Sequence, residues 1–480
     1  MVDEGLGAKV RAVRRREGLT QAQLAERLGI SASYLNLIER GKRPLPAALL
    51  IKLAQQLQVD LSSFSPDADA QLEASVREAL SDPLFDEHAL VGDDVKALVR
   101  GVPIAARALV TLYGAYRDAR SAADGLAQRL SDDDSEAATH AEAAAPSTEE
   151  VSELIQRRAN WFPELEVAAE ALVHDARLDP SDLGAGLTRW LTDQLHVDVR
   201  IIPASSAVTR RYDPARRELV LSEVLPPRSR NFQLAHTIAL LSHRETIERL
   251  SRDERLTSDE SRTLCQVALA NWFASAVLMP YDALLTAARE VRYDVELLGH
   301  RFRTSWEQVC HRLTSLRKPG AEGVPFHLVR VDVAGNISKR FSASGIRFPR
   351  FSGVCARWNV FRAFQTPGQV TVQVSQMPDG KRYFCFSRTV RREAGGFHAP
   401  RVVHAIGMGC PVEDARQLVY ADGVDLDDAA VPVKIGVTCR TCERMDCSER
   451  VCPPLQHPLR IDPFRRGQSF FAPMLPPGGR

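Results

Sequence analysis

The stretch "GLTQAQLAERLGISASYLNLIERGKRPL", residues 18–45, constrains the fold more than any other part of the chain. Thr20 is a good helix N-cap, Gly29 is of the type that ends helices, and Ser31 is a second N-cap. Apolar residues recur between them at helical spacing. Two short helices joined by a turn around a glycine form a helix-turn-helix unit. The helix before this unit is expected to carry a basic face of Arg11, Arg14, Arg15 and Arg16.

The second helix of such a unit enters the DNA major groove with its N-terminal residues, and flanking polar or basic side chains contact phosphates. The chain has a net charge of +1, yet residues 1–60 hold ten Lys or Arg against six Asp or Glu, so the basic surface is local. The predicted base-reading residues are Ser31, Ser33, Tyr34 and Asn36, and the predicted phosphate contacts are Gln21, Arg40, Lys42 and Arg43.

This stretch resembles the Cro/repressor-like helix-turn-helix family through its pattern "LTQxxLAxxLGIS…YLxxIExGxRxP". The resemblance implies a homodimer or higher homo-oligomer that binds a pseudo-palindromic operator.

The 480 residues allow several domains. The acidic, Ala/Ser-rich stretch "SDDDSEAATHAEAAAPSTEE" is typical of a flexible linker, and the helical segment before it is interpreted as a dimerising hairpin or as simple packing. A cytoplasmic protein is expected, because the chain begins without a signal peptide and has no unbroken apolar run of about 18 residues. The predicted divisions are a helix-turn-helix domain (1–66), a helical connector (67–130), the linker (131–150), a middle domain (151–317) and a C-terminal domain (318–480).

The middle domain is predicted to be α+β, with helices around a strand and a hairpin. It resembles the zinc-peptidase-like domain of phage and stress regulators, most specifically at "ANWFASAVLMP", residues 270–280. Active members carry HExxH, with two zinc-binding His and a catalytic Glu. Here His236 stands alone, because Thr237, Leu240 and Val267 occupy the positions of the base and the other ligands. We therefore expect a degenerate scaffold that keeps a ligand cleft and has no enzymatic activity, with His236 as a core or pocket residue.

Polar residues on the predicted cleft elements are the candidates for ligand binding, and Arg suits a phosphate-bearing ligand. The alternative is structural: the Arg side chains flank a solvated turn and Tyr281 packs beside a helix cap. The candidates are Arg210, Arg211, Tyr212, His236, Asn271 and Tyr281.

The C-terminal domain is predicted to be α+β with an antiparallel sheet, because alternating segments flank the turns "DVAGN" and "PDGK". Near its end, Cys439, Cys442, Cys447 and Cys452 follow C-x2-C-x4-C-x4-C spacing, which is that of a zinc knuckle. An iron–sulfur cluster also takes four thiolates, and Cys410, placed between a strand and a helix, is the candidate remote ligand. The spacing leaves both readings open. The other cysteines are expected in the core: Cys265, Cys310, Cys355 and Cys385.

The whole chain resembles the short-chain fatty acyl transcriptional regulators, through "RRYDP", "ALANWFASAVLMPY", "GVPFHLVRVDVAGNISKR", "AIGMGC" and "CRTCERMDCSERVCPP". The family implies a 4Fe–4S cluster and a pocket for coenzyme A or short acyl-CoA. Its cysteine pattern falls on Cys410, Cys439, Cys442 and Cys447. Cys452 departs from the family pattern and remains an alternative ligand, to iron or to zinc.

The sequence therefore predicts a multidomain transcriptional regulator of short-chain fatty-acid metabolism that binds operator DNA, senses acyl-CoA and carries an iron–sulfur cluster. Two alternatives remain open at this point. One is a regulator in which the cluster itself is the primary redox signal. The other is a residual metallopeptidase regulator with a C-terminal zinc knuckle.

Overall fold

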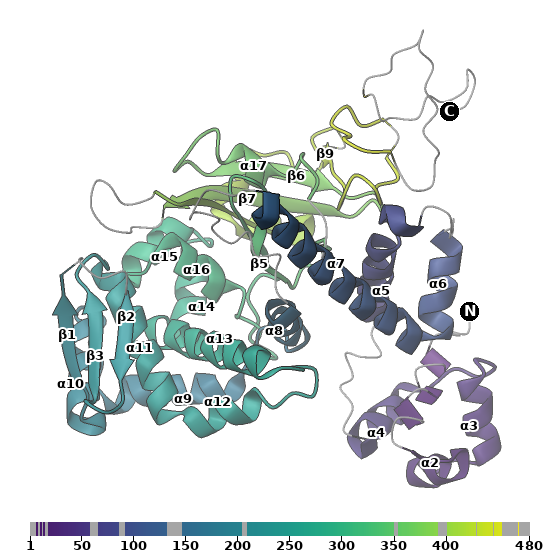
Figure 1. The fold of residues 1–480 in the computed structure, drawn as a ribbon, viewed down its shortest axis with the longest axis horizontal. Coiled ribbons are helices and arrows are strands. Elements are labelled where there is room, and N and C mark those ends of the chain that lie inside the picture. Colours follow the sequence, from purple (N-terminus) through teal and green to yellow (C-terminus); the bar gives the residue numbers. More distant parts are fainter. Residues whose placement is uncertain are drawn as a thin grey trace. The chain divides into compact units, whose positions relative to one another are not determined.

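In the computed structural model (Figure 1), the chain forms two compact units. The first comprises residues 1–143, 347–355 and 436–480, and the second residues 144–346 and 356–435. The predicted helix-turn-helix, α+β and sheet-containing parts are all present. The structure describes residues 6–7, 10–11, 13–14, 18–57, 66–85, 92–131, 146–203, 209–349, 354–391, 401–428, 430–444, 446–453 and 469.

The first unit contains the helix-turn-helix, and its local sequence signals are confirmed. Thr20 and Gln23 form a capping box at the start of α2 (Gln21–Leu28), and Gly29 ends this helix in the left-handed conformation. Ser31 caps α3 (Ala32–Glu39), and α4 (Ala47–Leu57) follows. The small core of this part consists of Val10, Leu24, Ala25, Leu28, Leu35, Leu53 and Leu57.

Arg14 is buried, which corrects the prediction that it belongs to a basic face. Its Nε and Nη2 donate to the two carboxylate oxygens of Glu39 at 2.6 and 3.0 Å, and its Nη1 donates to the carbonyl of Leu19 at 2.8 Å. Arg11 is exposed as predicted, while Arg15 and Arg16 lie outside the described residues. The fork of Arg14 thus ties the first helix to the end of α3.

The helices of the connector pack around a small core of their own. Val76, Val95, Val99, Ala106 and Val110 are buried together, since every third or fourth residue of these helices is apolar. The predicted linker, residues 131–150, overlaps both flanking helices, because Ser131 ends the last connector helix and residues 146–150 already belong to the next helix, α8. The elements of the connector are α5 (Pro66–Ala79), η2 (Pro83–Phe85), α6 (Gly92–Gly101) and α7 (Pro103–Ser131).

The second unit begins with helices around a three-stranded sheet. Strand β3 (Glu218–Ser222) lies in the centre, antiparallel to β2 (Arg210–Asp213) and parallel to β1 (Asp198–Ile202). The first two helices of this unit, α8 and α9, are separate, because Ala159 and Asn160 adopt positive φ between them. The helices are α8 (Pro146–Arg157), α9 (Pro163–Asp175), α10 (Leu183–Leu195), α11 (Pro227–Ser242), α12 (Arg244–Leu250) and α13 (Asp259–Leu278).

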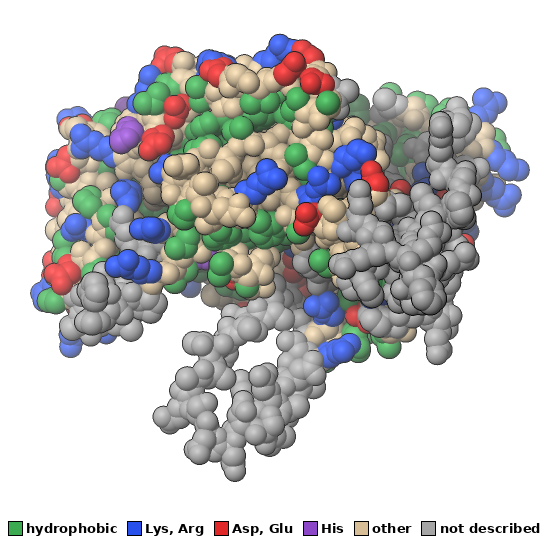
Figure 2. All heavy atoms as spheres, turned by 90° about the horizontal axis from the view of Figure 1, so that it is seen from above, with side chains coloured by type: hydrophobic (Ala, Val, Ile, Leu, Met, Phe, Trp, Pro, Cys, Tyr) green, Lys and Arg blue, Asp and Glu red, His purple; other side chains and the backbone are tan. Residues whose placement is uncertain are grey.

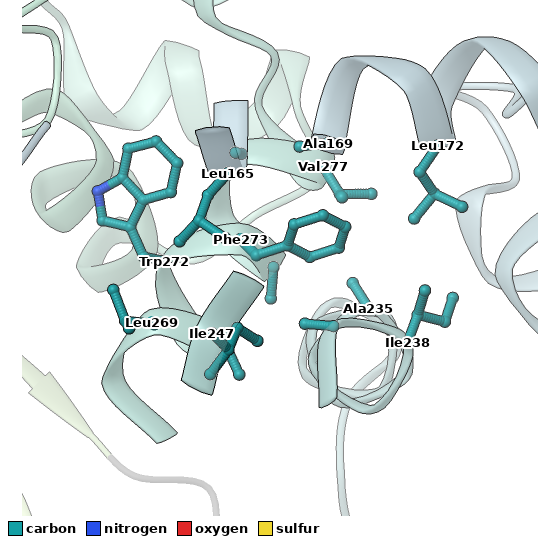
Figure 3. Packing of buried hydrophobic residues seen from close by; sticks show 14 of the residues in the cluster. Leu165, Ala169, Leu172, Ala235, Ile238, Ile247, Leu269, Trp272, Phe273 and Val277 are labelled. Atoms are coloured by element: carbon teal, nitrogen blue, oxygen red, sulfur yellow. The ribbon is translucent and has the colours of Figure 1, made fainter. Parts of the chain in front are cut away.

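The core of this part lies between α9, α11, α12 and α13 (Figure 3). Phe273 of α13 lies between α9 and α11, and Trp272 lies next to Leu165 of α9. Both α11 and α13 therefore have fixed positions and rotations, which matters because they carry the candidate pocket residues.

The larger sheet has six strands in the order β5-β4-β8-β7-β6-β9 and is antiparallel except where β9 joins β6. This confirms the predicted hairpins and adds one parallel edge strand. The helix predicted over "PVEDARQLVYADG" is instead two 3-10 helices, η3 (Val412–Gln417) and η4 (Val419–Ala421). The strands are β4 (His327–Val331), β5 (Ile337–Ser342), β6 (Thr371–Gln376), β7 (Arg382–Arg391), β8 (Val403–Pro411) and β9 (Val433–Lys434), and α17 (Asn359–Arg362) precedes β6.

The predicted boundary at residue 317 does not separate two cores. Buried residues of the helices before it, such as Tyr281 and Val309, share one cluster with sheet residues such as Phe384 and Met408. The domains before and after residue 317 are thus one folding unit. The helices are α14 (Tyr281–Glu290), α15 (Val295–Arg301) and α16 (Trp306–Leu313), which lie beside the sheet in Figure 1.

A buried arginine connects the two cores of this unit. Arg312 of α16 is 1% exposed, and its Nη2 donates to Glu166 of α9 at 2.7 Å. Its Nε donates to the carbonyl of Met279 at 3.0 Å, and its guanidinium lies 5.2 Å from the ring centroid of Trp272. Hydrogen bonds, a carboxylate and an aromatic face together compensate for burying the charge.

The distribution of surface charge agrees with the composition. On the face shown in Figure 2, charged side chains of both signs are interspersed among apolar ones, in keeping with the net charge of +1.

No single helix among the described residues is long and apolar enough to cross a membrane. Within the part of the chain that the structure describes, α13 and α14 taken together, with a bend of 62° between them, pass that test by length and composition.

Removing the partner of Arg312 should strongly destabilise the second unit. We expect Glu166→Ala to lower the free energy of unfolding by about 3–5 kcal/mol, because it leaves a buried charge without its carboxylate. Urea unfolding followed by tryptophan fluorescence measures this loss. Asp259→Ala, which removes an exposed partner of Arg262, is the control and should cost less than about 1 kcal/mol. Equal effects of the two substitutions would contradict the prediction.

Candidate functional site

The predicted DNA-contacting residues lie on the accessible surface of α3 and the turn after it. Ser31, Ser33, Arg40, Lys42 and Arg43 are exposed, and Tyr34 and Asn36 are half-buried. The hydroxyl of Ser31 accepts a hydrogen bond from the N–H of Tyr34 at 3.1 Å, so it also serves as the helix cap. The arrangement leaves the first turns of α3 free to enter a groove.

Gln21 has an internal role that the sequence did not indicate. Its Nε2 donates to Glu39 at 2.8 Å and to the Oδ1 of Asn36 at 3.4 Å. Burial alone would raise the pKa of Glu39, but hydrogen bonds from Arg14 and Gln21 outweigh it and hold that pKa below its usual value. Arg14 and Glu39 are therefore positioning residues that sequence reasoning missed. Glu39 follows the buried Leu35 by four residues, which was the available signal.

In the middle domain, His236 and Asn271 come together from α11 and α13. His236 is 1% exposed, and its Nδ1 lies 2.9 Å from the Oδ1 of Asn271. Because this oxygen accepts, Nδ1 carries the proton and Nε2 is left as an acceptor. That Nε2 atom is buried and has no hydrogen-bond partner among the described residues. Burial, and secondarily the charge of Arg210, lowers the pKa of His236 to about 4, so the imidazole is neutral at pH 7.

Neighbouring residues of strand β2 point to opposite faces of the sheet. Arg210 is half-buried near His236, and burial lowers its pKa. No carboxylate pairs with it within the described part of the chain. Tyr212, two residues on, packs against the same helical core. Arg211 lies between them and is exposed on the other face. The structure therefore does not place it in the predicted pocket.

The structure also does not place Tyr281 in the predicted pocket. This residue is fully buried in the core shared with the larger sheet. Its hydroxyl donates to the carbonyl of Ala321 at 3.0 Å and accepts from the N–H of Lys318 at 2.9 Å. Of the predicted pocket residues, the structure thus brings together Arg210, His236 and Asn271, with Tyr212 beside them. Thr237, at the position of the catalytic base, donates its hydroxyl proton to the carbonyl of Gln233.

The four clustered cysteines form a loop in the first unit. Cys442 folds back onto the chain, since a Cβ atom at Gly436 would lie 2.7 Å from its Sγ. Cys439 lies near enough to Cys452, and Cys447 near enough to Cys442, to influence the pKa of the neighbouring thiol. The side chains thus approach in pairs. Within the described ranges, no three His, Cys, Asp or Glu residues converge closely enough to hold a single metal ion.

Arg450 organises this loop from inside. It is 4% exposed and donates to the carbonyls of Cys439 at 2.6 Å and Cys442 at 2.8 Å. It also donates to the carbonyls of Arg444 and Cys452. Its Nε is buried without a hydrogen-bond partner in the described structure, and no carboxylate neutralises it there. A buried cation amid four cysteines fits an anionic thiolate centre, which would balance its charge.

Cys410 lies within β8 and not at a helix start, because the segment that follows is a 3-10 helix. Its side chain is fully buried in the core shared with Met408 and Phe384, and burial raises the pKa of the thiol well above its usual range. The expected helix N-terminus that would favour its thiolate is therefore not found. The other cysteines predicted in the core, Cys265, Cys310, Cys355 and Cys385, are all buried.

The family models that match the chain follow one another in the same order as the predicted domains. Residues 10–64 match the helix-turn-helix model, and residues 192–314 match the IrrE N-terminal-like domain. Residues 315–471 match the model "Short-chain fatty acyl coenzyme A regulator, C-terminal".

Similarity to characterised proteins extends over nearly the whole length. The chain is 39% identical over 462 residues to the propionyl-CoA carboxylase regulator of Cereibacter sphaeroides, covering 96% of this chain and 97% of that protein. It belongs to the short-chain fatty acyl coenzyme A regulators. The regulator is also similar to two proteins of Mycobacterium tuberculosis. It is 38% identical to RamB, covering 96% of this chain and 97% of RamB, and 35% identical to PrpR, covering 95% and 93%.

A solved structure of a Mycobacterium tuberculosis transcriptional regulator matches the regulator with a TM-score of 0.65 and 37% identity. The match covers 68% of this chain and 99% of that one. RamB and PrpR are HTH-type transcriptional regulators by name, and the regulator described here is a helix-turn-helix transcription factor.

Two substitutions in the helix-turn-helix should separate base reading from phosphate contact. We expect Asn36→Ala to cost about 1–3 kcal/mol and to relax base preference at one position, because its amide can read a base edge. Lys42→Ala should weaken binding to all sequences alike and reduce the slope of log affinity against log salt by about one. Fluorescence anisotropy with operator and scrambled DNA at several salt concentrations measures both.

Lys52→Ala is the charge-matched control, because the Nζ of Lys52 is already bonded to the carbonyl of Leu28. Its effect on DNA affinity should be smaller than that of Lys42→Ala. Operator binding that stays unchanged in both Asn36→Ala and Lys42→Ala would remove α3 and its flank from the interface.

Proposed function

We propose that this regulator tunes genes of short-chain fatty-acid metabolism by binding coenzyme A or a short acyl-CoA in the pocket of Arg210, His236 and Asn271. We also propose that it carries a 4Fe–4S cluster at the cysteine loop. The near full-length similarity to regulators such as the propionyl-CoA carboxylase regulator is the observation that carries the proposal. As in the sequence prediction, we expect a cytoplasmic homo-oligomer on operator DNA.

The chemistry of the pocket supports a thioester rather than a free acid. Arg210, half-buried and without a carboxylate partner in the described structure, suits a phosphate of coenzyme A. The buried Nε2 of His236 is an acceptor that needs a donor, and the amide and hydroxyl groups of coenzyme A supply donors. An ionised short-chain acid offers a negative charge but no donor. Coenzyme A derivatives therefore satisfy both groups at once.

The arrangement of the thiols in the loop supports a cluster over a single zinc ion. The thiols stand in pairs rather than converging on one point. A tetrahedral zinc site needs all four sulfurs about 2.3 Å from the metal, whereas a 4Fe–4S cluster binds each thiolate at a different iron. The buried guanidinium of Arg450 would offset the negative charge of either four-thiolate centre.

Isothermal titration calorimetry with the full-length protein tests the effector. We expect propionyl-CoA to bind more tightly than propionate, and Arg210→Ala to weaken binding about 10-fold or more, since a charge-assisted bond is lost. Arg211→Ala is the matched control on the same strand and should change affinity less than 2-fold. Because the pKa of His236 lies near 4, protonation of this imidazole should make no contribution to the pH dependence of affinity between pH 6 and 8.

Operator DNA must change thioester affinity by the same factor by which the thioester changes operator affinity, because binding linkage is reciprocal. Tighter binding of propionate, or equal losses in Arg210→Ala and Arg211→Ala, would refute the proposed pocket.

One contact favours a second function, in which the cluster itself is the signal. Glu443 of the cysteine loop lies 3.4 Å from Arg77 of α5, which also pairs with Glu73 at 2.8 Å. A change in the loop can therefore reach the helical connector that follows the DNA-binding helices. The pair is partly exposed, which limits its contribution to less than about 1 kcal/mol, or roughly fivefold in affinity.

We expect removal of the cluster by air to change operator affinity in the wild type, and the change to be smaller in Glu443→Gln. Glu449→Gln is the control, because Glu449 is exposed in the same loop. Anisotropy titrations of anaerobic and air-treated protein give the comparison. A response to air that is unchanged in Glu443→Gln would exclude this route.

A further inference from the structure

Cys355 lies beside the cysteine loop, although 84 residues separate it from Cys439 in the sequence. Its backbone N–H donates to the carbonyl of Val437 at 2.9 Å. Residues 347–355 belong to the same compact unit as residues 436–480. A hydrogen bond between two backbones brings their Cα atoms within about 5–6 Å of each other. Cys355 is thus held against the segment that leads directly into Cys439.

Cys442 is held against that same segment. Its sulfur packs so closely on Gly436 that any side chain there would collide with it. Gly436 and Val437 are adjacent, so Cys355 and Cys442 approach one short stretch of backbone. The cysteine loop therefore meets a fifth cysteine that comes from a distant part of the sequence.

Cys452 and Cys410 have different surroundings. Cys452 lies close to Cys439, so its thiol is placed to donate to a ligating sulfur. Cys410 belongs to the other compact unit. It lies opposite Phe384 in the sheet, inside an apolar core whose other members include Met408 and Ile406. Unlike Cys355, it has no backbone connection to the loop among the described contacts.

We propose that Cys355, with Cys439, Cys442 and Cys447, supplies the four thiolates of the metal centre, and that Cys452 donates a hydrogen bond to the sulfur of Cys439. This assignment rests on the proposed metal centre but not on which metal fills it. Three ligands close together with one remote in the sequence is a common pattern for iron–sulfur clusters.

The test uses the full chain purified without oxygen, with iron, sulfide and zinc measured per chain and the visible spectrum recorded. The wild type should contain about four irons and four sulfides. Cys355→Ala should contain less than about a quarter of the wild-type iron. Cys410→Ala and Cys385→Ala should retain wild-type iron, and Cys385 is matched to Cys355 in burial at 7% against 8%. Cys452→Ala should keep the cluster, with a shifted reduction potential because a hydrogen bond to sulfur is lost.

Cys355→Ser provides a second readout, because its hydroxyl preserves the size of the side chain and can still bind iron. We expect it to retain a cluster with an altered electron paramagnetic resonance spectrum after reduction. Circular dichroism and gel filtration check that each variant is folded. Iron kept in Cys355→Ala but lost in Cys410→Ala or Cys452→Ala would overturn the assignment, as would a wild-type spectrum in Cys355→Ser.

The metal content of the wild type separates this inference from the proposed cluster. A colourless wild type with one zinc would refute the iron–sulfur proposal. In that case the same variants still decide the ligands, since zinc lost in Cys355→Ala and kept in Cys410→Ala supports the assignment, and the reverse overturns it.

Discussion

The second unit depends on one interaction, the ion pair between the buried guanidinium of Arg312 and the carboxylate of Glu166. It connects α9 and α16, and the face of the guanidinium lies against Trp272 of α13. Asn271, the next residue to Trp272, orients the imidazole of His236. The candidate effector pocket is therefore built on a helix that also packs against this ion pair. Because the pair lies between two cores, it also explains why the peptidase-like helices and the large sheet fold as one body.

Local signals in the sequence predicted local structure well. The caps Thr20 and Ser31 and the stop at Gly29 are where the sequence placed them, because each depends on neighbours within four residues. The alternation in the two C-terminal hairpins likewise predicted their pairing. The same reasoning failed for Arg14, since its partner Glu39 is 25 residues away and a run of arginines looks like a solvated face.

Predictions for the candidate sites failed for two reasons, one local and one tertiary. Arg211 was grouped with its neighbours, although the two-residue repeat of a strand places it on the opposite face. Tyr281 follows a conspicuous "LMP" motif, but its hydroxyl is bonded to the backbone of residues 318 and 321, which only the tertiary structure brings near. The position of Cys355 beside residue 437 could not be read from spacing, because the two segments pair across the sequence.

The contact between Arg77 and Glu443 has a consequence for the order of synthesis. The two residues are 366 positions apart, and both belong to the first unit. At about 5–20 residues per second, a ribosome needs roughly 20–70 s to add the second after the first. During that interval the DNA-binding helices can fold on the nascent chain while the cysteine loop does not yet exist. The coupling between loop and connector is thus acquired only near the end of translation, after the second unit has been made.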